Sequence, residues 1–362
     1  MTESTVLFTG FPGFIGMRLL PRLMELSPQA RFRCLVQSRF LEAARQGIAQ
    51  IETSHPQTRG RADVVVGDIT EPGLGLADGD ARALRESLTA AHHLAAVYDL
   101  AVPRELGLRV NLHGTRNVVR FLAECPRLER LHYVSTCYVS GTTKGVFHED
   151  DLDVGQSFKN FYEETKFLAE MEVARSGLPV TTYRPSIVVG DSRTGETGKF
   201  DGPYYTLAAM DKLPSPGAFL RIGAGQNPIN VVPVDFVVEA LARLSTRGEA
   251  ATRTYHLADP QPLAVIEVER LFARALGKSF VFVPVPKGLA KAFLGLGPVH
   301  RRFGIPAQSL DYFDHPLRFD TTEAGRALAA FGLECPRLAD YVDRLVSFYR
   351  QHRGAVRREA MV

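Results

Sequence analysis

TGFPGFIG, residues 9–16, places glycines at positions 10, 13 and 16 between an apolar run and a helix-like segment. Glycines at this spacing permit a tight turn and let the backbone approach a pyrophosphate, which then lies at the N-terminus of the following helix. Ordinary tight turns also use glycine, so the strand before the loop and the helix after it decide between the two interpretations. The stretch therefore predicts a dinucleotide contact made by Gly10, Phe11, Pro12, Gly13, Phe14, Ile15 and Gly16.

Beyond this loop, short apolar runs alternate with longer helix-like segments. The runs are brief, apolar and closed by turn residues, which predicts strands at residues 4–10, 32–37, 62–68, 91–97, 130–136 and 179–190. Helices between consecutive strands imply parallel βαβ units. We therefore expect an α/β fold, a Rossmann-type doubly wound parallel sheet with a smaller, discontinuous C-terminal substrate lobe.

The alternation loosens after Gly190, where residues 190–205 form a polar, glycine-rich stretch typical of a long loop. Strand and helix patterns return at residues 229–245 and 253–259. We therefore expect an NADP-binding Rossmann domain made of residues 1–190 plus about 227–260. The substrate-binding lobe is expected to comprise about 191–226 plus 261–362.

Composition excludes several classes of protein. The chain of 362 residues is 45% hydrophobic and 23% charged, and its formal net charge of +3 is too small to indicate nucleic acid. Its four cysteines show no CxxC spacing or paired framework, so we expect reduced thiols and no metal site. His92 and His93 are expected to pack and hydrogen-bond at a strand end. No signal peptide and no run of about 18 apolar residues is evident, so we expect a cytoplasmic protein without a transmembrane segment.

The residues that close the second and third strands bear on the choice of cofactor. An acid after the second strand would bind the 2′-hydroxyl of NADH, whereas an arginine accommodates the 2′-phosphate of NADPH. This chain has Gln37, Ser38 and Arg39 there, which favours NADPH over NADH, although Arg39 could be a plain surface charge. Asp68 and Ile69 follow the third strand, and Asp68 could either cap its loop or reach the adenine amino group.

Tyr162 and Lys166, in NFYEETKF (160–167), lie four positions apart in a helix-compatible run. This spacing puts both side chains on one helix face. A lysine ammonium one turn away favours the phenolate and should bring the pKa of the tyrosine toward the working range. Lys166 could also hydrogen-bond the nicotinamide ribose. Glu163 and Glu164 are expected on the solvated sides of the helix.

These motifs together resemble an extended short-chain dehydrogenase/reductase. The resemblance rests on the glycine loop, DI at 68–69, HLAA at 93–96, the Ser-Thr pair at 135–136 and the YxxxK motif. Four further segments resemble the fatty acyl-CoA reductase and thioester reductase branch of male-sterility-type proteins. They are VSTCYVSG (134–141), YRPSIVVGDSRTGETGKFDGPYY (183–205), NVVPVDFVVEAL (230–241) and YHLADP (255–260).

The resemblance implies roles for further residues. Thr136, five residues before Gly141, matches the catalytic hydroxyl, with Ser135 as the alternative, although a Ser-Thr pair can simply cap a turn. Asn111 matches a helix position where the family often has asparagine, and it is either catalytic or a buried, helix-kinking residue. The remaining implied cofactor contacts are Leu94, Ala95 and Ala96, and the segment for the nicotinamide carboxamide, Pro185, Ser186, Ile187 and Val188, which could also be a plain buried strand end.

We therefore expect an NADPH-dependent oxidoreductase that reduces a fatty-acyl-type carbonyl, from thioester to aldehyde, from aldehyde to alcohol, or both, with Tyr162 as proton donor. The expected substrates are an acyl-CoA, a carrier-bound acyl group or a long-chain aldehyde, and a homodimer is expected by resemblance. The alternatives are a hydroxysteroid-type alcohol/ketone oxidoreductase, a sugar-nucleotide epimerase or dehydratase, and a non-catalytic NADP-binding protein.

Two segments of the expected lobe stay open. Residues 286–306, with Leu289, Phe293 and Leu296, could line an alkyl channel, touch a membrane surface or pack as an amphipathic helix on their own domain. Residues 311–315, which bring together Asp311, Tyr312, Asp314 and His315, resemble a recurring feature of this branch to which the sequence assigns no role.

Overall fold

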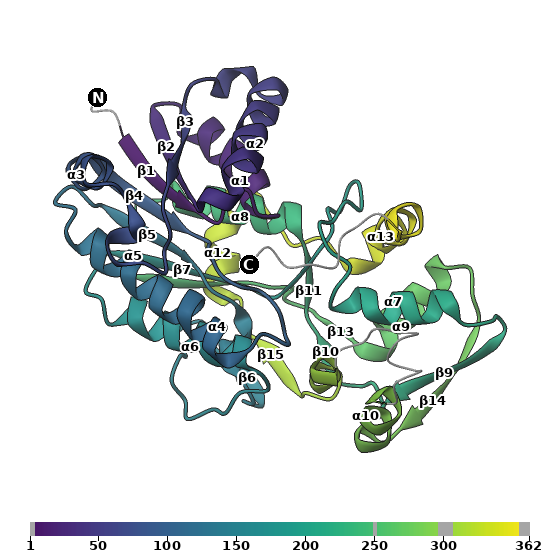
Figure 1. The fold of residues 1–362 in the computed structure, drawn as a ribbon. Coiled ribbons are helices and arrows are strands. Elements are labelled where there is room, and N and C mark those ends of the chain that lie inside the picture. Colours follow the sequence, from purple (N-terminus) through teal and green to yellow (C-terminus); the bar gives the residue numbers. More distant parts are fainter. Residues whose placement is uncertain (1–3, 249–251, 296–306, 355–362) are drawn as a thin grey trace.

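A seven-stranded, fully parallel sheet forms the centre of the protein (Figure 1). The computed structural model describes residues 4–248, 252–295 and 307–354. The strand order is β12-β7-β5-β4-β1-β2-β3, and it reverses direction between β1 and β4, which opens a crevice at their carboxyl ends. The predicted Rossmann-type fold is therefore confirmed. The strands are β1 (Ser4–Thr9), β2 (Ala30–Val36), β3 (Ala62–Val66), β4 (Leu88–His93), β5 (Arg130–Val134), β7 (Val180–Pro185) and β12 (Arg253–Leu257).

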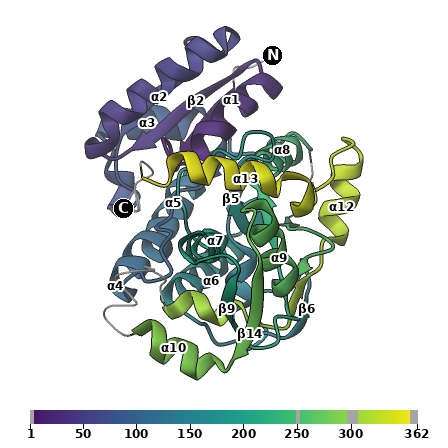
Figure 2. The ribbon, with the colours of Figure 1, turned by 90° about the vertical axis from the view of Figure 1, so that its right-hand side faces the viewer.

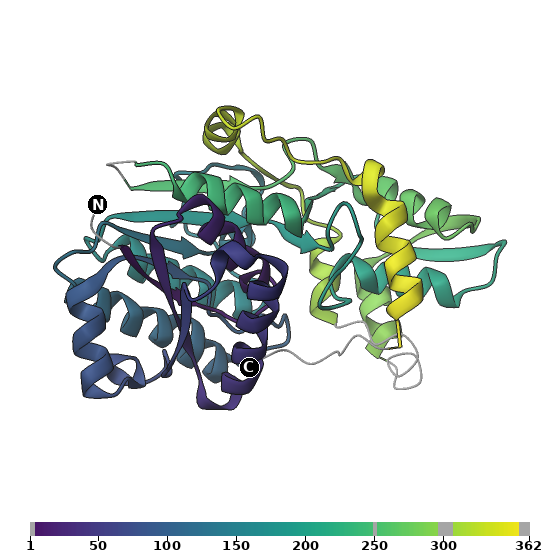
Figure 3. The same cartoon turned by 90° about the horizontal axis from the view of Figure 1, so that it is seen from above.

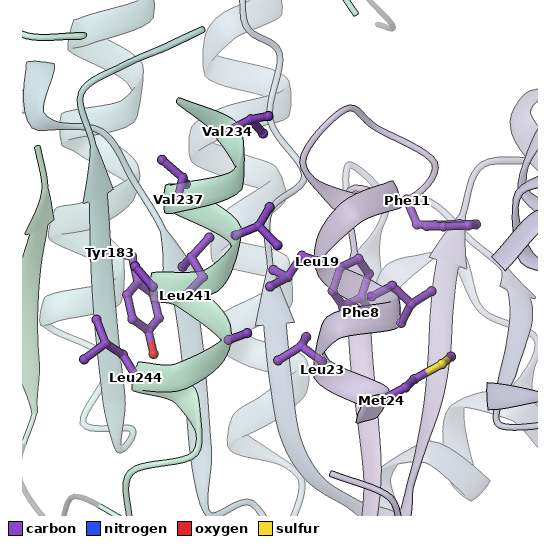
Figure 4. Close-up of a cluster of buried hydrophobic side chains, with 14 of the residues drawn as sticks. Phe8, Phe11, Leu19, Leu23, Met24, Tyr183, Val234, Val237, Leu241 and Leu244 are labelled. Carbon is purple, nitrogen blue, oxygen red and sulfur yellow. The ribbon is translucent and has the colours of Figure 1, made fainter. Parts of the chain in front are cut away.

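Helices cover both faces of this sheet (Figure 1). Figure 4 shows the first face, where Leu19 and Leu23 of α1 lie opposite Val237 and Leu241 of α8. Each such apolar side chain contributes about 1.5–3 kcal/mol when fully buried. The helices of the first face are α1 (Gly16–Leu26), α2 (Leu41–Ser54) and α8 (Val234–Ser245), and those of the second are α3 (Asp78–Ser87), α5 (Gly114–Ala123) and α6 (Phe161–Ala174).

The single strand predicted at residues 179–190 is wrong in one respect, because the structure divides it into two. Strand β7 ends at Pro185, and β8 (Ile187–Val189) leaves the main sheet to pair with β11 (Val231–Pro233). Proline has no N–H to donate to a sheet ladder, so a strand tends to end or change partner there. Asn230 holds the new path, since its Oδ1 accepts from Ser186 Oγ at 2.7 Å.

The smaller lobe lies next to the carboxyl ends of the sheet strands (Figures 2 and 3). Its core is formed mainly by α7 (Pro203–Lys212), α9 (Val265–Ala275) and α13 (Leu338–His352). The short strands pair as β9 (Gly217–Ile222) with β14 (Phe280–Val285), and as β10 (Pro228–Ile229) with β13 (Leu263–Ala264). The helix α10 (Lys287–Gly295) also belongs to this part of the chain, whereas the short helix α4 (Arg104–Gly107) lies beside α6 at the main sheet. The division into two domains at the expected boundaries stays a prediction.

A late segment of the chain returns from the lobe side to the sheet. Strand β15 (Leu317–Phe319) pairs with β6 (Gly145–Phe147), and α12 (Thr322–Ala329) adds Ala324 and Leu328 to the core beneath α8. Glu149 caps α12, because its carboxylate accepts from the Glu323 and Ala324 N–H groups at 2.6 and 3.0 Å. Such a cap satisfies orphan donors of the first helical turn.

The structure bears on membrane spanning and on the segment 286–306, whose role the sequence leaves undecided. Across residues 4–248, 252–295 and 307–354, no helix combines the length and apolarity that crossing a bilayer requires. Residues 296–306, including Leu296, lie outside the described part of the chain. Within α10, Leu289 is 66% exposed.

A buried ion pair joins α6 to β7. Arg184 donates from Nε and Nη2 to Glu170 Oε1 at 2.9 and 2.6 Å, and both side chains are at most 3% exposed. Arg184 also donates to the Glu149 carbonyl at 3.4 Å and lies 3.1 Å from His256 Nε2. A charge so deeply buried is tolerated only when it is paired and hydrogen-bonded.

His92 and His93 have the packing role that the sequence predicts. The His92 ring stacks on the His132 ring with centroids 4.5 Å apart. His93 Nδ1 lies 2.7 Å from Thr9 Oγ1, and its Nε2 lies 3.0 Å from Thr115 Oγ1. Burial lowers the pKa of His92 and of His93 to about 3, so both rings stay neutral in the folded protein at ordinary pH.

His92→Phe should therefore make folding less sensitive to acid. The unfolded chain protonates His92 near pH 6.5, whereas the folded chain does not until about pH 3. Wild-type stability should thus fall relative to the variant by about 1.4 kcal/mol per pH unit below about pH 6.5. Urea unfolding of both proteins measures this difference. The difference in free energy of unfolding between the two proteins should stay constant above about pH 7.5. If this difference also stays constant down to about pH 5, the prediction is wrong.

Candidate active site

A cavity of about 1320 Å³ opens at the carboxyl ends of the sheet strands. This exceeds the roughly 300–1,000 Å³ of a single small-molecule pocket, so it has room for a cofactor and a second molecule. Every residue predicted to contact the cofactor lines it. These are Gly10, Phe11, Pro12, Gly13, Phe14, Ile15, Gly16, Gln37, Ser38, Arg39, Asp68, Ile69, Leu94, Ala95, Ala96, Tyr162, Lys166, Pro185, Ser186, Ile187 and Val188.

The glycine loop presents backbone to this cavity, as a pyrophosphate site requires. Gly10 has φ +86°, and a Cβ there would lie 2.8 Å from Leu94 Cβ. A Cβ on Gly16 would lie 2.6 Å from the Gly10 carbonyl oxygen. Helix α1 begins at Gly16, so the positive end of its dipole faces the loop. A side chain at Gly10 or Gly16 would therefore clash with neighbouring protein atoms, and this close backbone packing next to a helix N-terminus fits a dinucleotide loop.

The segments that follow β2 and β3 are joined by side-chain hydrogen bonds. Asp68 Oδ2 accepts from Gln37 Nε2 at 2.8 Å, and Asp68 Oδ1 accepts from the Thr70 N–H at 2.8 Å. Although partial burial raises it, these bonds hold the pKa of Asp68 below its usual value. Of its two predicted roles, the structure shows the loop cap. Exposed Arg39 donates to Gln37 Oε1 at 2.8 Å and lies over the Phe40 ring.

Tyr162 stands in the first turn of α6 and lines the cavity together with Thr136. Burial raises the pKa of Tyr162, and the neighbouring Thr136 side chain opposes this rise. Lys166 Nζ donates to the Tyr133 hydroxyl at 3.0 Å and to the Val134 carbonyl at 2.9 Å. Burial lowers the pKa of Lys166 to about 8, and nearby Glu170 opposes the change.

The expected lowering of the Tyr162 pKa by Lys166 is therefore not what the structure shows. Burial is the larger effect on the phenol, and the Lys166 ammonium directs hydrogen bonds to Tyr133 and Val134. Removing charge from water disfavours phenolate and ammonium alike. At neutral pH the tyrosine is thus a protonated donor beside a lysine that is close to titrating.

Both members of the Ser-Thr pair line the cavity. Thr136 Oγ1 accepts from the Tyr138 N–H at 3.3 Å and donates to the Pro185 carbonyl at 3.4 Å. Thr136 thus serves the turn-capping role and also contacts Tyr162. This contact favours Thr136 over Ser135 as the catalytic hydroxyl.

Asn111 is the one predicted site residue that does not line the cavity. It is buried in a π-helical stretch, Leu108–His113. Its Oδ1 accepts from the Val97 N–H at 2.8 Å, and its Nδ2 donates to Thr165 Oγ1 at 3.1 Å. Asn111 therefore fixes the loop after β4 against α6, which agrees with the buried, helix-distorting alternative.

Aromatic side chains near Tyr162 form a wall that the sequence did not predict, although two of them lie in the segment 311–315 that the sequence singles out. It consists of Tyr98, Tyr138, Tyr312 and Phe313, which all line the cavity. Tyr98 meets Tyr162 edge-on with centroids 5.1 Å apart, and Tyr138 meets Tyr312 edge-on at 5.0 Å. Tyr138 lies inside the VSTCYVSG segment and could have been suspected. No sequence signal connects Tyr98 or Tyr312 with the tyrosine at 162.

The expected solvation of Glu163 is wrong. Its side chain is fully buried, whereas Glu164 is 22% exposed and pairs with Arg104 at 2.6 Å. The buried carboxylate is accepted because Lys159, itself only 6% exposed, lies 3.3 Å away. A charge at this depth needs such a partner.

Comparison with known proteins identifies several similar chains. A family of NAD-binding proteins described as male sterility protein matches residues 8–241. Fatty acyl-CoA reductase wat of Drosophila melanogaster is 26% identical over 291 residues, which cover 70% of this chain and 56% of that protein. Aldehyde reductase lnaA of Aspergillus flavus is 26% identical over 277 residues, 72% of this chain and 26% of that protein.

Among solved structures, the terminal R domain from the myxalamid PKS-NRPS biosynthetic pathway superposes with a TM-score of 0.81 at 30% identity. The match covers 98% of this chain and 92% of that chain. The chain thus spans nearly the whole of this solved domain. It spans 56% and 26% of the two curated relatives.

Proposed function

Since the chain belongs to the male sterility protein family, within the extended short-chain dehydrogenases/reductases, we propose that it is an NADPH-dependent reductase of a fatty-acyl-type carbonyl. The reaction is thioester to aldehyde, in which the C–S bond breaks and the thiol is released, aldehyde to alcohol, or both. The observation that carries the proposal is the Tyr162–Thr136 hydroxyl pair beside Lys166, in a cavity shared by the glycine loop and the aromatic wall. Family membership confirms the expected class; the cofactor preference, substrate and residue roles are our proposals.

The proposed chemistry divides between cofactor and protein. Bound NADPH supplies the hydride. Tyr162 donates the proton to the carbonyl oxygen, and its raised pKa keeps it protonated at neutral pH. Thr136 donates a hydrogen bond to the same oxygen and stabilises the negative charge that develops there. Lys166, with two N–H bonds directed to Tyr133 and Val134, offers its third donor to the nicotinamide ribose.

A substrate panel tests the reaction. We expect NADPH consumption with acyl-CoAs or long-chain aldehydes, and the acyl group could equally arrive on a carrier protein. A parallel arm with steroid ketones covers the other oxidoreductase class. Turnover of ketones together with silence on every thioester and aldehyde would sink the proposal. A homodimer, expected by resemblance, stays a prediction.

Arg39→Ala tests the cofactor preference. If the Arg39 guanidinium binds the 2′-phosphate, its removal deletes a charge-assisted contact and should weaken NADPH binding about 10–100-fold. NADH binding should change less than about twofold, because NADH has no phosphate there. Arg45→Ala, at an exposed position on α2 that does not line the cavity, is the matched control. Equal losses for both cofactors in a fluorescence titration would contradict the assignment.

The pH profile tests the role of Lys166. Because its pKa in the folded protein is lowered from 10.5 to about 8, the ammonium is lost as pH rises through that value. If the ammonium is required, kcat/KM for NADPH should fall about tenfold per pH unit above about pH 8. Lys166→Arg, whose guanidinium stays charged, should be slower overall and should lack this descending limb. A wild-type profile that stays flat to about pH 9.5 would be the contrary result.

A further inference from the structure

The first turn of α6 carries a buried charged cluster that the proposed chemistry does not use. The Glu163 carboxylate accepts from the Lys159 N–H at 3.0 Å and lies 3.3 Å from Lys159 Nζ. Lys159 Nζ also donates to the Gly141 carbonyl. Burial raises the pKa of Glu163 and lowers that of Lys159, and each charge opposes the shift of the other.

Tyr312 is held by this same turn, although it lies about 150 positions later in the chain. Asn160 Nδ2 donates to the Tyr312 hydroxyl at 2.8 Å, and that hydroxyl lies close enough to Glu163 to help lower the pKa of its carboxyl group. The Lys159 ammonium lies 5.2 Å from the centre of the Tyr312 ring, within the range of a cation–π contact. Three residues of one turn thus fix both the ring and the hydroxyl.

The Tyr312 ring belongs to the cavity, where it meets Tyr138 edge-on and is followed by Phe313. The glycine loop and the β2 and β3 strand ends line another part of the same cavity. Tyr162 lies one residue before Glu163, so the helix that carries the proposed proton donor also holds this aromatic ring. The ring faces offer an apolar surface against which an alkyl chain can pack.

We propose that Tyr312 is a specificity-determining residue that forms the acyl-side wall of the cavity, and that Glu163, with Lys159, is the positioning residue that sets its place. The proposal rests on the proposed function and names how that site selects its substrate. The ring fixes the space available to the alkyl chain beside the carbonyl carbon. Glu163 acts only through Tyr312 and touches neither cofactor nor substrate.

The test compares octanol with butanol, two unreactive product-like alcohols, binding to the NADP⁺-loaded protein. Tyr312→Ala should change the ratio of their dissociation constants about tenfold, because the long chain alone reaches the wall. Glu163→Gln should shift the ratio in the same direction by about threefold, while NADP⁺ affinity changes less than about twofold. Glu164→Gln, in the same turn but paired with Arg104 outside the cavity, is the matched control and should leave the ratio unchanged.

Tyr312→Phe keeps the ring and removes only the hydroxyl, so it covers the case in which Tyr312→Ala does not fold. If Glu163 acts through that hydroxyl, the double variant Tyr312→Phe/Glu163→Gln should shift the ratio of alcohol dissociation constants no further than Tyr312→Phe alone. If the shifts of the two single variants multiply in the double variant, Glu163 does not act through Tyr312. If the ratio is unchanged in both Tyr312 variants, Tyr312 does not form the acyl-side wall. A wild type that bound neither alcohol would also overturn the wall. Because binding needs no turnover, the proposed reaction can fail independently of this result.

Discussion

Tyr162→Phe should lower kcat about 10²–10⁴-fold, the usual contribution of a positioned general acid. The variant keeps the ring that packs edge-on against Tyr98 and removes only the hydroxyl that shares the cavity with Thr136. NADPH affinity should change less than about twofold, because a group that acts in the proton-transfer step does not contribute to ground-state binding. The loss should therefore appear in kcat with little change in the KM for NADPH.

Tyr341→Phe supplies the matched control for this substitution. Tyr341 lies on α13 in the lobe core, and its buried hydroxyl has no hydrogen-bond partner among the described residues. The same atom is removed there without touching the cavity, so activity should be retained. Single-turnover kinetics with the best substrate of the panel would separate chemistry from product release. Full activity in Tyr162→Phe would remove Tyr162 as the proton donor.

Glu170→Gln should destabilise the fold by about 3–5 kcal/mol, because it leaves the Arg184 charge buried without its partner. Both side chains of the pair are at most 3% exposed, so solvent cannot replace the lost carboxylate. Glu172→Gln on the same helix breaks a second ion pair, with Arg116 at 2.7 Å, whose side chains are about one third exposed. Exposed pairs contribute about 0–1 kcal/mol, so this control should be nearly neutral.

Urea unfolding of the two variants measures this difference. Similar stabilities for Glu170→Gln and Glu172→Gln would mean that the Arg184 charge finds another partner, such as the Glu149 carbonyl. Activity gives an independent reading, since Glu170 opposes the lowering of the Lys166 pKa. Where Glu170→Gln remains folded, the alkaline limb of its pH profile should move to lower pH.

The parts of the site that were predictable from sequence are those with local signals. Gly10 and Gly16 mark the loop because close backbone approach excludes a side chain, and Tyr162 and Lys166 share a face because helix geometry fixes their spacing. The alternation of apolar runs and helices was sufficient for the parallel sheet. Each of these features depends on residues close together in the chain.

What sequence could not predict depends on distant partners. The sequence predicts that Glu163 is a solvated helix residue, and its burial is explained only by its contacts with Lys159 and Tyr312. Burial likewise reverses the expected direction of the Tyr162 pKa, an effect that spacing to Lys166 does not reveal. The turn from β7 into β8 depends on Asn230, which comes from a segment about 40 residues away.

The return of β15 and α12 to the sheet has a consequence for dividing the protein. A fragment ending near residue 260 would retain all seven strands, yet it would lose α12 and leave bare the apolar core surface that Ala324 and Leu328 cover. The Glu149 carboxylate would lose the helix N-terminus that it caps. Such a fragment should aggregate. The sheet and its covering helices therefore need residues 317–329 as well as the chain up to residue 260, and a fragment that folds has to include both.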